Sequence, residues 1–239
     1  MLAAALPPLA VTFYADHEHP HPVVVEHWDW PTVVEFFSEH DFTPCTPCPG
    51  GQKCLHKKTE AFSPVHLRLT TCAANSAPHL HRGNDYVEHV SMLVFDLDHV
   101  TRAELEGVCD RLEGLESLIS STHSHLHGGP DDNCVRLILP LSRALSPAEF
   151  RHVHREVRKR YTLEWKRPGA SIFSGVDQST RDLSRLYFLP TAPIGAEVIE
   201  GHESGALLDL DELLRNRTPD LPSASPGAVR PASPPTVAP

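Results

Sequence analysis

The sequence predicts an α+β protein, and three observations lead to that prediction. Short apolar runs suited to β-strands alternate with segments that carry apolar residues at helical spacing. Two of these helical segments begin with a capping box, at residues 101–104 and 146–149. A short loop containing a Gly-Gly-Pro turn at 128–130 joins two of the strands, which is typical of an antiparallel hairpin.

The stretch from Ser91 to Val100 is the element around which the prediction is organised. Its apolar residues run into Asp96 and Asp98, as expected of a buried strand that ends by presenting charge. Residues i and i+2 of a strand share a face, so both carboxylates should project from that face, with Cα atoms roughly 6 to 7 Å apart. As exposed, mutually repulsive groups at the end of a strand, they should contribute little to stability. Paired carboxylates suit Mg²⁺ or Mn²⁺, which serve phosphoryl transfer. The alternative is an Asp96 that begins a turn and an Asp98 that caps the next helix.

The elements after this strand predict a layered sheet. A helix follows, and then two strands over 118–121 and 135–141. Strand, helix, strand, strand is half of a ferredoxin-like split βαβ layer. A second helix should run from Ser146 to Tyr161, and further strands are expected over 171–177 and 185–190.

The chain is predicted to have three parts. Residues 1–85 form an N-terminal αβ portion, with a helix capped by Asp29 and a cysteine-rich loop at 45–56, and residues 86–216 form a second region that carries the paired aspartates. Residues 217–239 are rich in proline and carry almost nothing to bury, so we expect a disordered tail or a linker.

Composition narrows the function without choosing it. The 239 residues are 40% hydrophobic, enough for a real core, and no apolar run approaches the ~20 residues of a membrane span. The first ten residues lack the basic flank of a signal peptide, so we expect a cytoplasmic protein without a membrane partner. A net charge of -10 argues against a protein that coats nucleic acid by bulk electrostatics. Residues 143–168, with eight Lys/Arg against three Glu, are the local exception where we expect a phosphate backbone or a triphosphate, although such a helix face is often merely solvated.

A cysteine-rich loop precedes the region that carries the paired aspartates. Cys45, Cys48, Cys54 and His56 lie on a Pro/Gly segment, and their types and close spacing are those of a small zinc knuckle. We therefore expect these four residues to bind one structural Zn²⁺. The same residues could instead form a loop of free thiols, or two of the cysteines a redox pair.

Four motifs carry a resemblance to a known family. They are an apolar D-x-D strand at 94–98, Thr-His-Ser-His at 122–125, an Arg-apolar-Pro-Leu strand at 136–141, and an Asp…Arg…Pro segment at 177–190. In this order they resemble the archaeo-eukaryotic primase superfamily, and more narrowly the primase-polymerase domains of plasmids, phages and integrated mobile elements. The resemblance covers roughly residues 86–193.

The resemblance implies a primase-polymerase palm with an RRM-like antiparallel sheet and flanking helices. Asp96, Asp98 and Asp177 would be the catalytic residues and hold Mg²⁺ or Mn²⁺. The nucleotide would be bound by Ser121, His123, Ser124, His125, Arg136 and Arg185. Both histidines fit the small-x-His or H-x-H pattern of the motif, and we favour His125 as the one that faces the triphosphate.

The function that follows is a template-directed nucleotidyltransferase. We expect a DNA primase, a DNA polymerase or both, which uses two metal ions in the replication of a mobile element. Its partners would be a single-stranded DNA template and NTP or dNTP. A replicative helicase would act in trans or lie beyond the tail.

Three other classes deserve comparison. The run from Phe95 to Thr101 also resembles the motif of aspartate-nucleophile phosphatases. That fold needs this strand near its start and a later lysine and acidic pair, whereas this chain offers only Asp131 and Asp132, in a loop. The two histidines at 123 and 125 resemble the H-x-H site of rolling-circle replication nicking endonucleases, for which Tyr161 or Tyr187 would be the nucleophile. A nonenzymatic zinc-dependent nucleic-acid-binding adaptor would need none of these aspartates.

Overall fold

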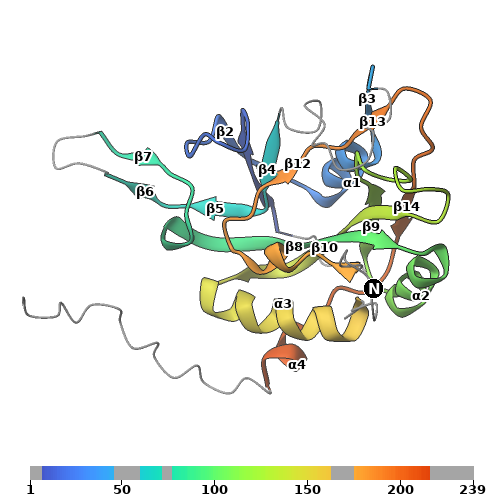
Figure 1. Ribbon diagram of the computed structural model, residues 1–239. Helices are drawn as coiled ribbons and strands as arrows, with labels where there is room; N and C mark the ends of the chain where they lie inside the picture. The colour runs from blue at the N-terminus through green and yellow to red at the C-terminus, as the bar shows by residue number, and fades with distance from the viewer. Residues whose placement is uncertain (1–6, 46–59, 72–76, 163–174, 216–239) are drawn as a thin grey trace, which may run out of the picture.

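The computed structural model describes residues 7–45, 60–71, 77–162 and 175–215 (Figure 1). The strands are β1 Leu9–Tyr14, β2 Val24–Trp28, β3 Asp41–Thr43, β4 Ala61–Ser63, β5 Val65–Leu67, β6 Leu69–Thr70, β7 His79–Leu80, β8 Val87–Val100, β9 Ser117–Ser121, β10 Asn133–Leu145, β11 Gly175–Val176, β12 Tyr187–Phe188, β13 Thr191–Pro193 and β14 Glu200–Glu203. The helices are α1 Trp30–Ser38, α2 Arg102–Leu112, α3 Pro147–Tyr161 and α4 Leu210–Arg215, with 3₁₀ turns at Asn84–Tyr86 and Gln178–Arg181. The expected tail at 217–239, and the first four residues of the strand expected over 171–177, lie outside the described residues.

The protein is of the α+β class, and its central sheet has the order β11-β8-β10-β9-β14. β10 is antiparallel to both β8 and β9, so β8 and β9 are parallel and α2 connects them. β11, which follows α3, pairs antiparallel with β8 on its other edge. This is the split βαβ arrangement, in which the strand of a hairpin lies between two parallel strands. The predicted antiparallel pairing of the second and third strands is therefore confirmed.

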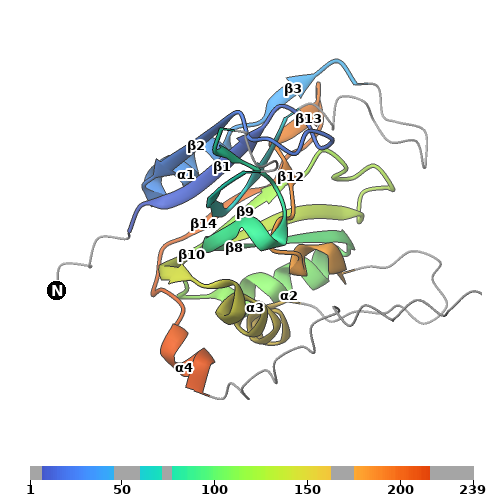
Figure 2. The ribbon, with the colours of Figure 1, turned by 90° about the vertical axis from the view of Figure 1, so that its left-hand side faces the viewer.

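A second sheet with the order β12-β4-β1-β2 packs on one face of the central sheet, and the helices α2 and α3 pack on the other (Figure 2). The alternation along β8 explains the two layers, because successive side chains of a strand point to opposite faces. Leu93, Phe95 and Leu97 enter the cluster formed with the helices. Met92 and Val94 enter the cluster formed with β1, β4, β12 and α1.

The helices begin where the sequence predicts. In α2, Thr101 and Glu104 form both hydrogen bonds of a capping box, and Ser146 and Glu149 do so in α3. The side chain of Asp29 accepts a hydrogen bond from the backbone N–H of Thr32 at the start of α1. Among the described residues, no helix has the length and apolar character needed to cross a membrane.

Segments on both sides of the expected domain boundary at residue 85 share the two sheets. β5 pairs with the N-terminal end of β8, whereas β11 pairs with residues 97 and 98 near its C-terminal end, and so β5 joins the central sheet. β12, from the C-terminal part, pairs with β4 and so joins the second sheet. The N-terminal portion therefore forms a layer of the same structure as the region that carries the aspartates.

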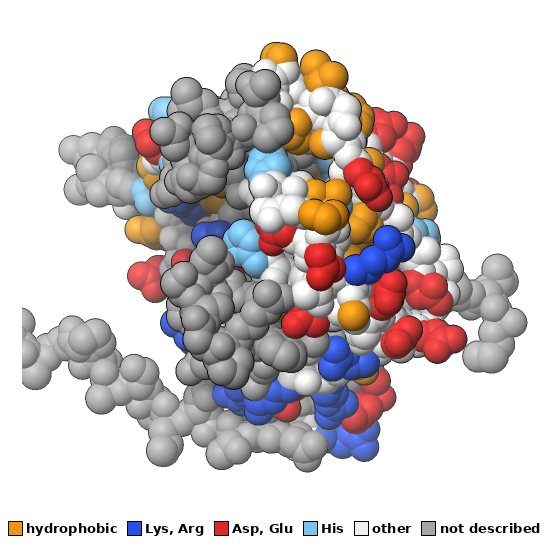
Figure 3. All heavy atoms as spheres, turned by 45° about the vertical axis from the view of Figure 1, so that its right-hand side comes forward, with side chains coloured by type: hydrophobic (Ala, Val, Ile, Leu, Met, Phe, Trp, Pro, Cys, Tyr) orange, Lys and Arg blue, Asp and Glu red, His pale blue; other side chains and the backbone are white. Residues whose placement is uncertain are grey.

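The basic island lies on the helical side of the central sheet. Within the described residues it consists mainly of α3. Lys and Arg side chains gather in the lower part of the molecule, where α3 lies, with acidic side chains among them (Figure 3). Acidic partners neutralise several of these charges, in the ion pairs Arg143–Glu149, Arg155–Glu156 and Arg160–Glu212. The expected phosphate site on this helix is therefore on the face of the sheet opposite to the one from which Asp96 projects.

His154 is a buried imidazole between α3 and β8. Its ring centroid lies 4.6 Å from that of Phe95 and 5.3 Å from that of Phe150. Burial, assisted by the nearby Arg158 cation, lowers the pKa of His154 to about 4. The fold therefore holds this side chain in its neutral form.

Stability should fall as the pH is lowered through the range set by His154. The unfolded chain binds the proton near the ordinary histidine pKa of about 6.5, whereas the folded chain binds it only near pH 4. The free energy of unfolding is therefore unaffected by this proton above the pKa of the unfolded chain. Between that pKa and the pKa of the folded chain it falls, by about 3 kcal/mol in all. Urea unfolding at a series of pH values should show a shallower dependence for His154→Leu than for the wild type. Equal slopes would contradict this.

Candidate active site

Four polar residues form a row across the central sheet. Asp96 on β8 is paired with Arg136 on β10, and Arg136 is paired in turn with Ser120 on β9. The backbone N–H of Asp177, directly after β11, donates to the carbonyl of Asp96 at 2.9 Å. Directly opposed residues of neighbouring strands share a face, so the sheet itself brings these distant parts of the sequence together.

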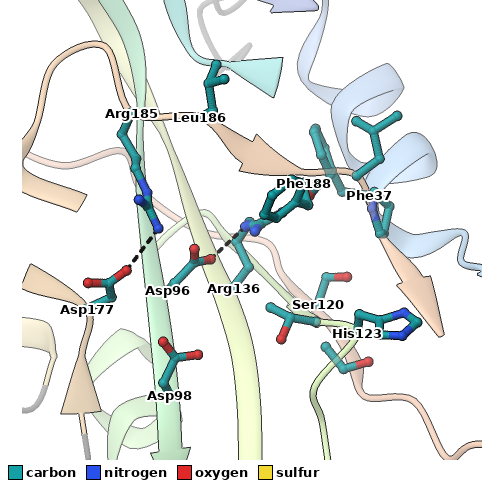
Figure 4. A pocket seen from close by; sticks show the side chains of 14 residues that line it. Phe37, Asp96, Asp98, Ser120, His123, Arg136, Asp177, Arg185, Leu186 and Phe188 are labelled. Carbon is teal, nitrogen blue, oxygen red and sulfur yellow. Dashed lines mark hydrogen bonds and ion pairs between the residues drawn. The ribbon is translucent and has the colours of Figure 1, made fainter. Parts of the chain in front are cut away.

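The row forms one wall of a pocket between the two sheets (Figure 4). The pocket is lined by Phe37, Asp96, Asp98, Ser120, Ser121, Thr122, His123, Arg136, Asp177, Arg185, Leu186, Phe188, Leu189 and Pro190. Seven of the nine residues expected to act in catalysis or nucleotide binding are among them. Ser124 and His125 are not, and neither is any residue of α3.

Asp96 and Arg136 form a buried ion pair. The Nε of Arg136 donates to Oδ1 of Asp96 at 2.8 Å, and their side chains are only 8% and 12% exposed. Nη1 of the same guanidinium donates to the carbonyl of Phe188 at 2.6 Å. Asp96 is therefore not the exposed carboxylate that the sequence predicted. The prediction failed because the strand pairing that places Arg136 opposite Asp96 is not encoded in the sequence around either residue.

Asp177 and Arg185 form a second ion pair, which is more accessible. Nη2 of Arg185 lies 3.0 Å from Oδ2 of Asp177, and about a third of each side chain is exposed. Asp177 also caps the following 3₁₀ turn by accepting from the backbone N–H of Ser179 at 2.9 Å. Asp177 thus combines the two roles, pocket carboxylate and cap, that the sequence left as alternatives for such residues.

The three carboxylates offer the oxygen ligands that a hard divalent cation prefers. Arg136 attracts Asp96 and Arg185 attracts Asp177, so these two side chains point toward different arginines, with Asp98 beside them (Figure 4). In the described residues, the groups of three whose ligand atoms all lie within 4.8 Å of one another do not include this trio. A carboxylate has two oxygens with about four acceptor sites, so each aspartate can keep its arginine and still offer an oxygen.

The histidine in the pocket is His123. Its Nδ1 lies 2.9 Å from the hydroxyl of Thr191, and the residue is 3% exposed. His125 instead lies with Nδ1 3.4 Å from the backbone N–H of Cys134, and burial lowers its pKa. The pocket lining thus includes His123 and not the favoured His125, and which of the two faces a triphosphate stays a prediction. The short turn after β9 turns the second histidine away from the pocket, and the sequence of that turn does not reveal which one remains.

Several residues around the pocket were not predicted. The apolar side is formed by Phe37 from α1 together with Phe188 and Leu189. His40, whose side chain is 1% exposed, supports the end of β9, with Nε2 2.9 Å from the carbonyl of Ser121. As one of 17 histidines in the sequence, it carried no local pattern that distinguished it.

The proposed zinc loop falls almost wholly outside the described residues. Cys48, Cys54 and His56 lie in the undescribed segment 46–59, and Cys45 is buried at its edge. Zinc binding by this loop therefore stays a prediction.

Asp96 and Asp98 should differ sharply when each is replaced by alanine. Asp96→Ala leaves the buried guanidinium of Arg136 without its counter-charge, which typically costs 3 to 5 kcal/mol, about that much being expected here. Asp98→Ala replaces a half-buried residue of the pocket lining and should cost less, about 1 kcal/mol, which is typical of a point mutation. Urea unfolding measures both, and Asp96→Ala combined with Arg136→Met should recover part of the loss. Equal losses for the two single variants would contradict the structural role of Asp96.

Comparison with known proteins gives one match. The model of the VapE N-terminal domain family matches residues 78–221, which is more than half of the chain. No curated protein and no solved structure matches significantly. The matched segment includes β8, β9, β10, α2, α3 and the pocket aspartates. Domains of this kind occur in VapE-like proteins of phages and plasmids, and hence in a mobile-element context. The chain belongs to the family of VapE N-terminal domains.

Proposed function

We propose that the pocket is the active site of a template-directed nucleotidyltransferase, a DNA primase, a DNA polymerase or both, that acts in the replication of a mobile element. The observation that carries the proposal is the composition of one pocket wall. Three aspartates, two arginines and a histidine from separate segments line the same pocket on a split βαβ sheet. Such a sheet with strand-end carboxylates is what a primase-polymerase palm would require.

The carboxylates would hold Mg²⁺ or Mn²⁺. Such ions lower the cost of activating a 3′ hydroxyl and stabilise charge on the transferring phosphoryl group. Asp98, two residues after Asp96 on β8, lines the same pocket and would be one ligand. Asp96 and Asp177 would contribute the remaining oxygens.

The cationic side chains would bind the triphosphate. Arg185, which is partly exposed, would exchange its carboxylate for a phosphate oxygen, because a triphosphate carries more negative charge than a single aspartate. His123 would lie beside the same phosphates from the end of β9. Phe37 and Phe188 give the pocket an apolar side on which a base could pack.

The proposed partners follow from this chemistry. A single-stranded DNA template and NTP or dNTP are the substrates that the reaction needs. The proposed helicase partner would act in trans or beyond residues 217–239. Zinc bound by the cysteine loop would be structural, since four protein ligands leave no open position for substrate.

The nicking alternative finds less support. Tyr187 is 3% exposed, its hydroxyl donates to the carbonyl of Val94 at 3.0 Å, and burial raises its pKa above the usual range. Tyr161 ends α3, on the other face of the central sheet. Neither tyrosine lines the pocket, and only one of the two histidines does.

Nucleotide incorporation is the direct test. The wild type should incorporate labelled nucleotides on a single-stranded template in Mg²⁺ or Mn²⁺, with or without a primer. Asp98→Ala should lower the rate at least about a hundredfold, because metal-ligand interactions supply several kcal/mol in the transition state. Asp110→Ala, an exposed change on α2, is the matched control and should leave the rate unchanged. An active Asp98→Ala, or an inactive wild type under all these conditions, would contradict the proposal.

The two histidines should separate in the same assay. His123→Ala should raise the apparent KM for nucleotide or lower kcat about tenfold or more, as expected for loss of a group that contacts phosphate. His125→Ala should leave the KM near the wild-type value, with circular dichroism checking its fold. The reverse order would restore His125 as the nucleotide ligand. A covalent phosphotyrosyl adduct with DNA would replace the polymerase by a nicking enzyme.

A further inference from the structure

A second group of metal-binding side chains lies at the other end of β8. His66 on β5 and Glu88 and His89 on β8 place one ligand atom each within 4.8 Å of one another. Nδ1 of His66 is 2.9 Å from Oε2 of Glu88. The rings of His66 and His89 are stacked, with centroids 4.7 Å apart and planes within 2°.

A bulge in β8 explains how two consecutive residues reach the same side. Along a regular strand, Glu88 and His89 would point to opposite faces. The register between β5 and β8 pairs His66 with His89 and then Leu67 with Val87, so Glu88 is an extra residue. A bulge of this kind changes the direction of the side chains around it, so Glu88 and His89 can both face His66.

A third histidine stands next to this group. The ring of His27, an exposed residue of β2, has its centroid 5.7 Å from that of His66. β2 belongs to the second sheet, whereas β5 and β8 belong to the central sheet. The histidines therefore come from both layers of the protein.

We propose that His66, Glu88 and His89 bind a Zn²⁺ ion, with His27 supplying a fourth ligand from the second sheet. Two imidazoles and a carboxylate suit a borderline metal such as zinc, whereas Mg²⁺ and Ca²⁺ prefer oxygen ligands alone. Four protein ligands make a closed, structural site. The ion would link the second sheet to the central sheet.

The site is distinct from the pocket. His89 and Asp96 are seven positions apart on β8, which corresponds to about 23 Å along a strand. None of the proposed ligands belongs to the cysteine loop, so the proposal does not depend on the nucleotidyltransferase assignment or on the zinc knuckle.

Cobalt spectroscopy on the untagged full chain tests the proposal. Co²⁺ added to chelator-treated protein should give visible d–d absorption from a site that lacks thiolate-to-metal charge transfer, because its ligands are nitrogen and oxygen. Zn²⁺ should displace this cobalt. His66→Ala and His89→Ala should each weaken binding at least about a hundredfold, since losing even an outer-shell partner costs 10- to 100-fold. His27→Ala should weaken it about tenfold.

His202→Ala is the matched control. His202 forms a similar histidine–carboxylate pair, with Nε2 2.7 Å from Oε1 of Glu116, and its replacement should leave cobalt binding unchanged. Circular dichroism establishes that the variants remain folded. The proposal is overturned if the wild type shows only cobalt with thiolate charge transfer, or if the nitrogen–oxygen site survives both His66→Ala and His89→Ala. Unchanged binding in His27→Ala would remove the fourth ligand and with it the link between the sheets.

Discussion

The buried charge of Arg136 is the constraint on which the two-sheet arrangement depends. Its guanidinium is satisfied by Asp96 within the central sheet and by the carbonyl of Phe188 in the second sheet. The rings of Phe62 and Tyr187 lie against it, with centroids 5.5 and 5.1 Å from Cζ. A buried cation without its partners is strongly unfavourable. Separating the sheets would remove the partners that the second sheet supplies to this guanidinium and would therefore be costly.

The same contacts give the two arginines of the pocket different roles. Arg136 is held by both sheets and serves as a fixed positive charge. Arg185 has one carboxylate partner and greater exposure, so it has more freedom to change partners. A rigid cation beside an adaptable one is an arrangement suited to a ligand whose negative charge is distributed along its length.

The parts of the fold that the sequence predicted are those encoded by local patterns. The apolar run of β8, the capping boxes of α2 and α3, and the Gly-Pro turn before β10 each act within a few residues. The joining of β5 and β12 to different sheets depends on pairings between distant segments, which no local pattern contains. The same limit applies to the site. The presence of Asp96, Asp98, Asp177 and Arg136 in one pocket followed from motif order, but the burial of Asp96 followed only from register.

The alternation along β8 restricts how the length of this strand can vary. Its odd-numbered residues near the centre face the helices, and its even-numbered residues face the second sheet and the pocket. Inserting or deleting one residue between the bulge at Glu88 and Asp96 would exchange the two faces, sending carboxylates into the helical core and leucines into the pocket. Homologous chains should therefore tolerate length changes in the loops around this strand, whereas within it they should change length only by whole two-residue steps or by another bulge.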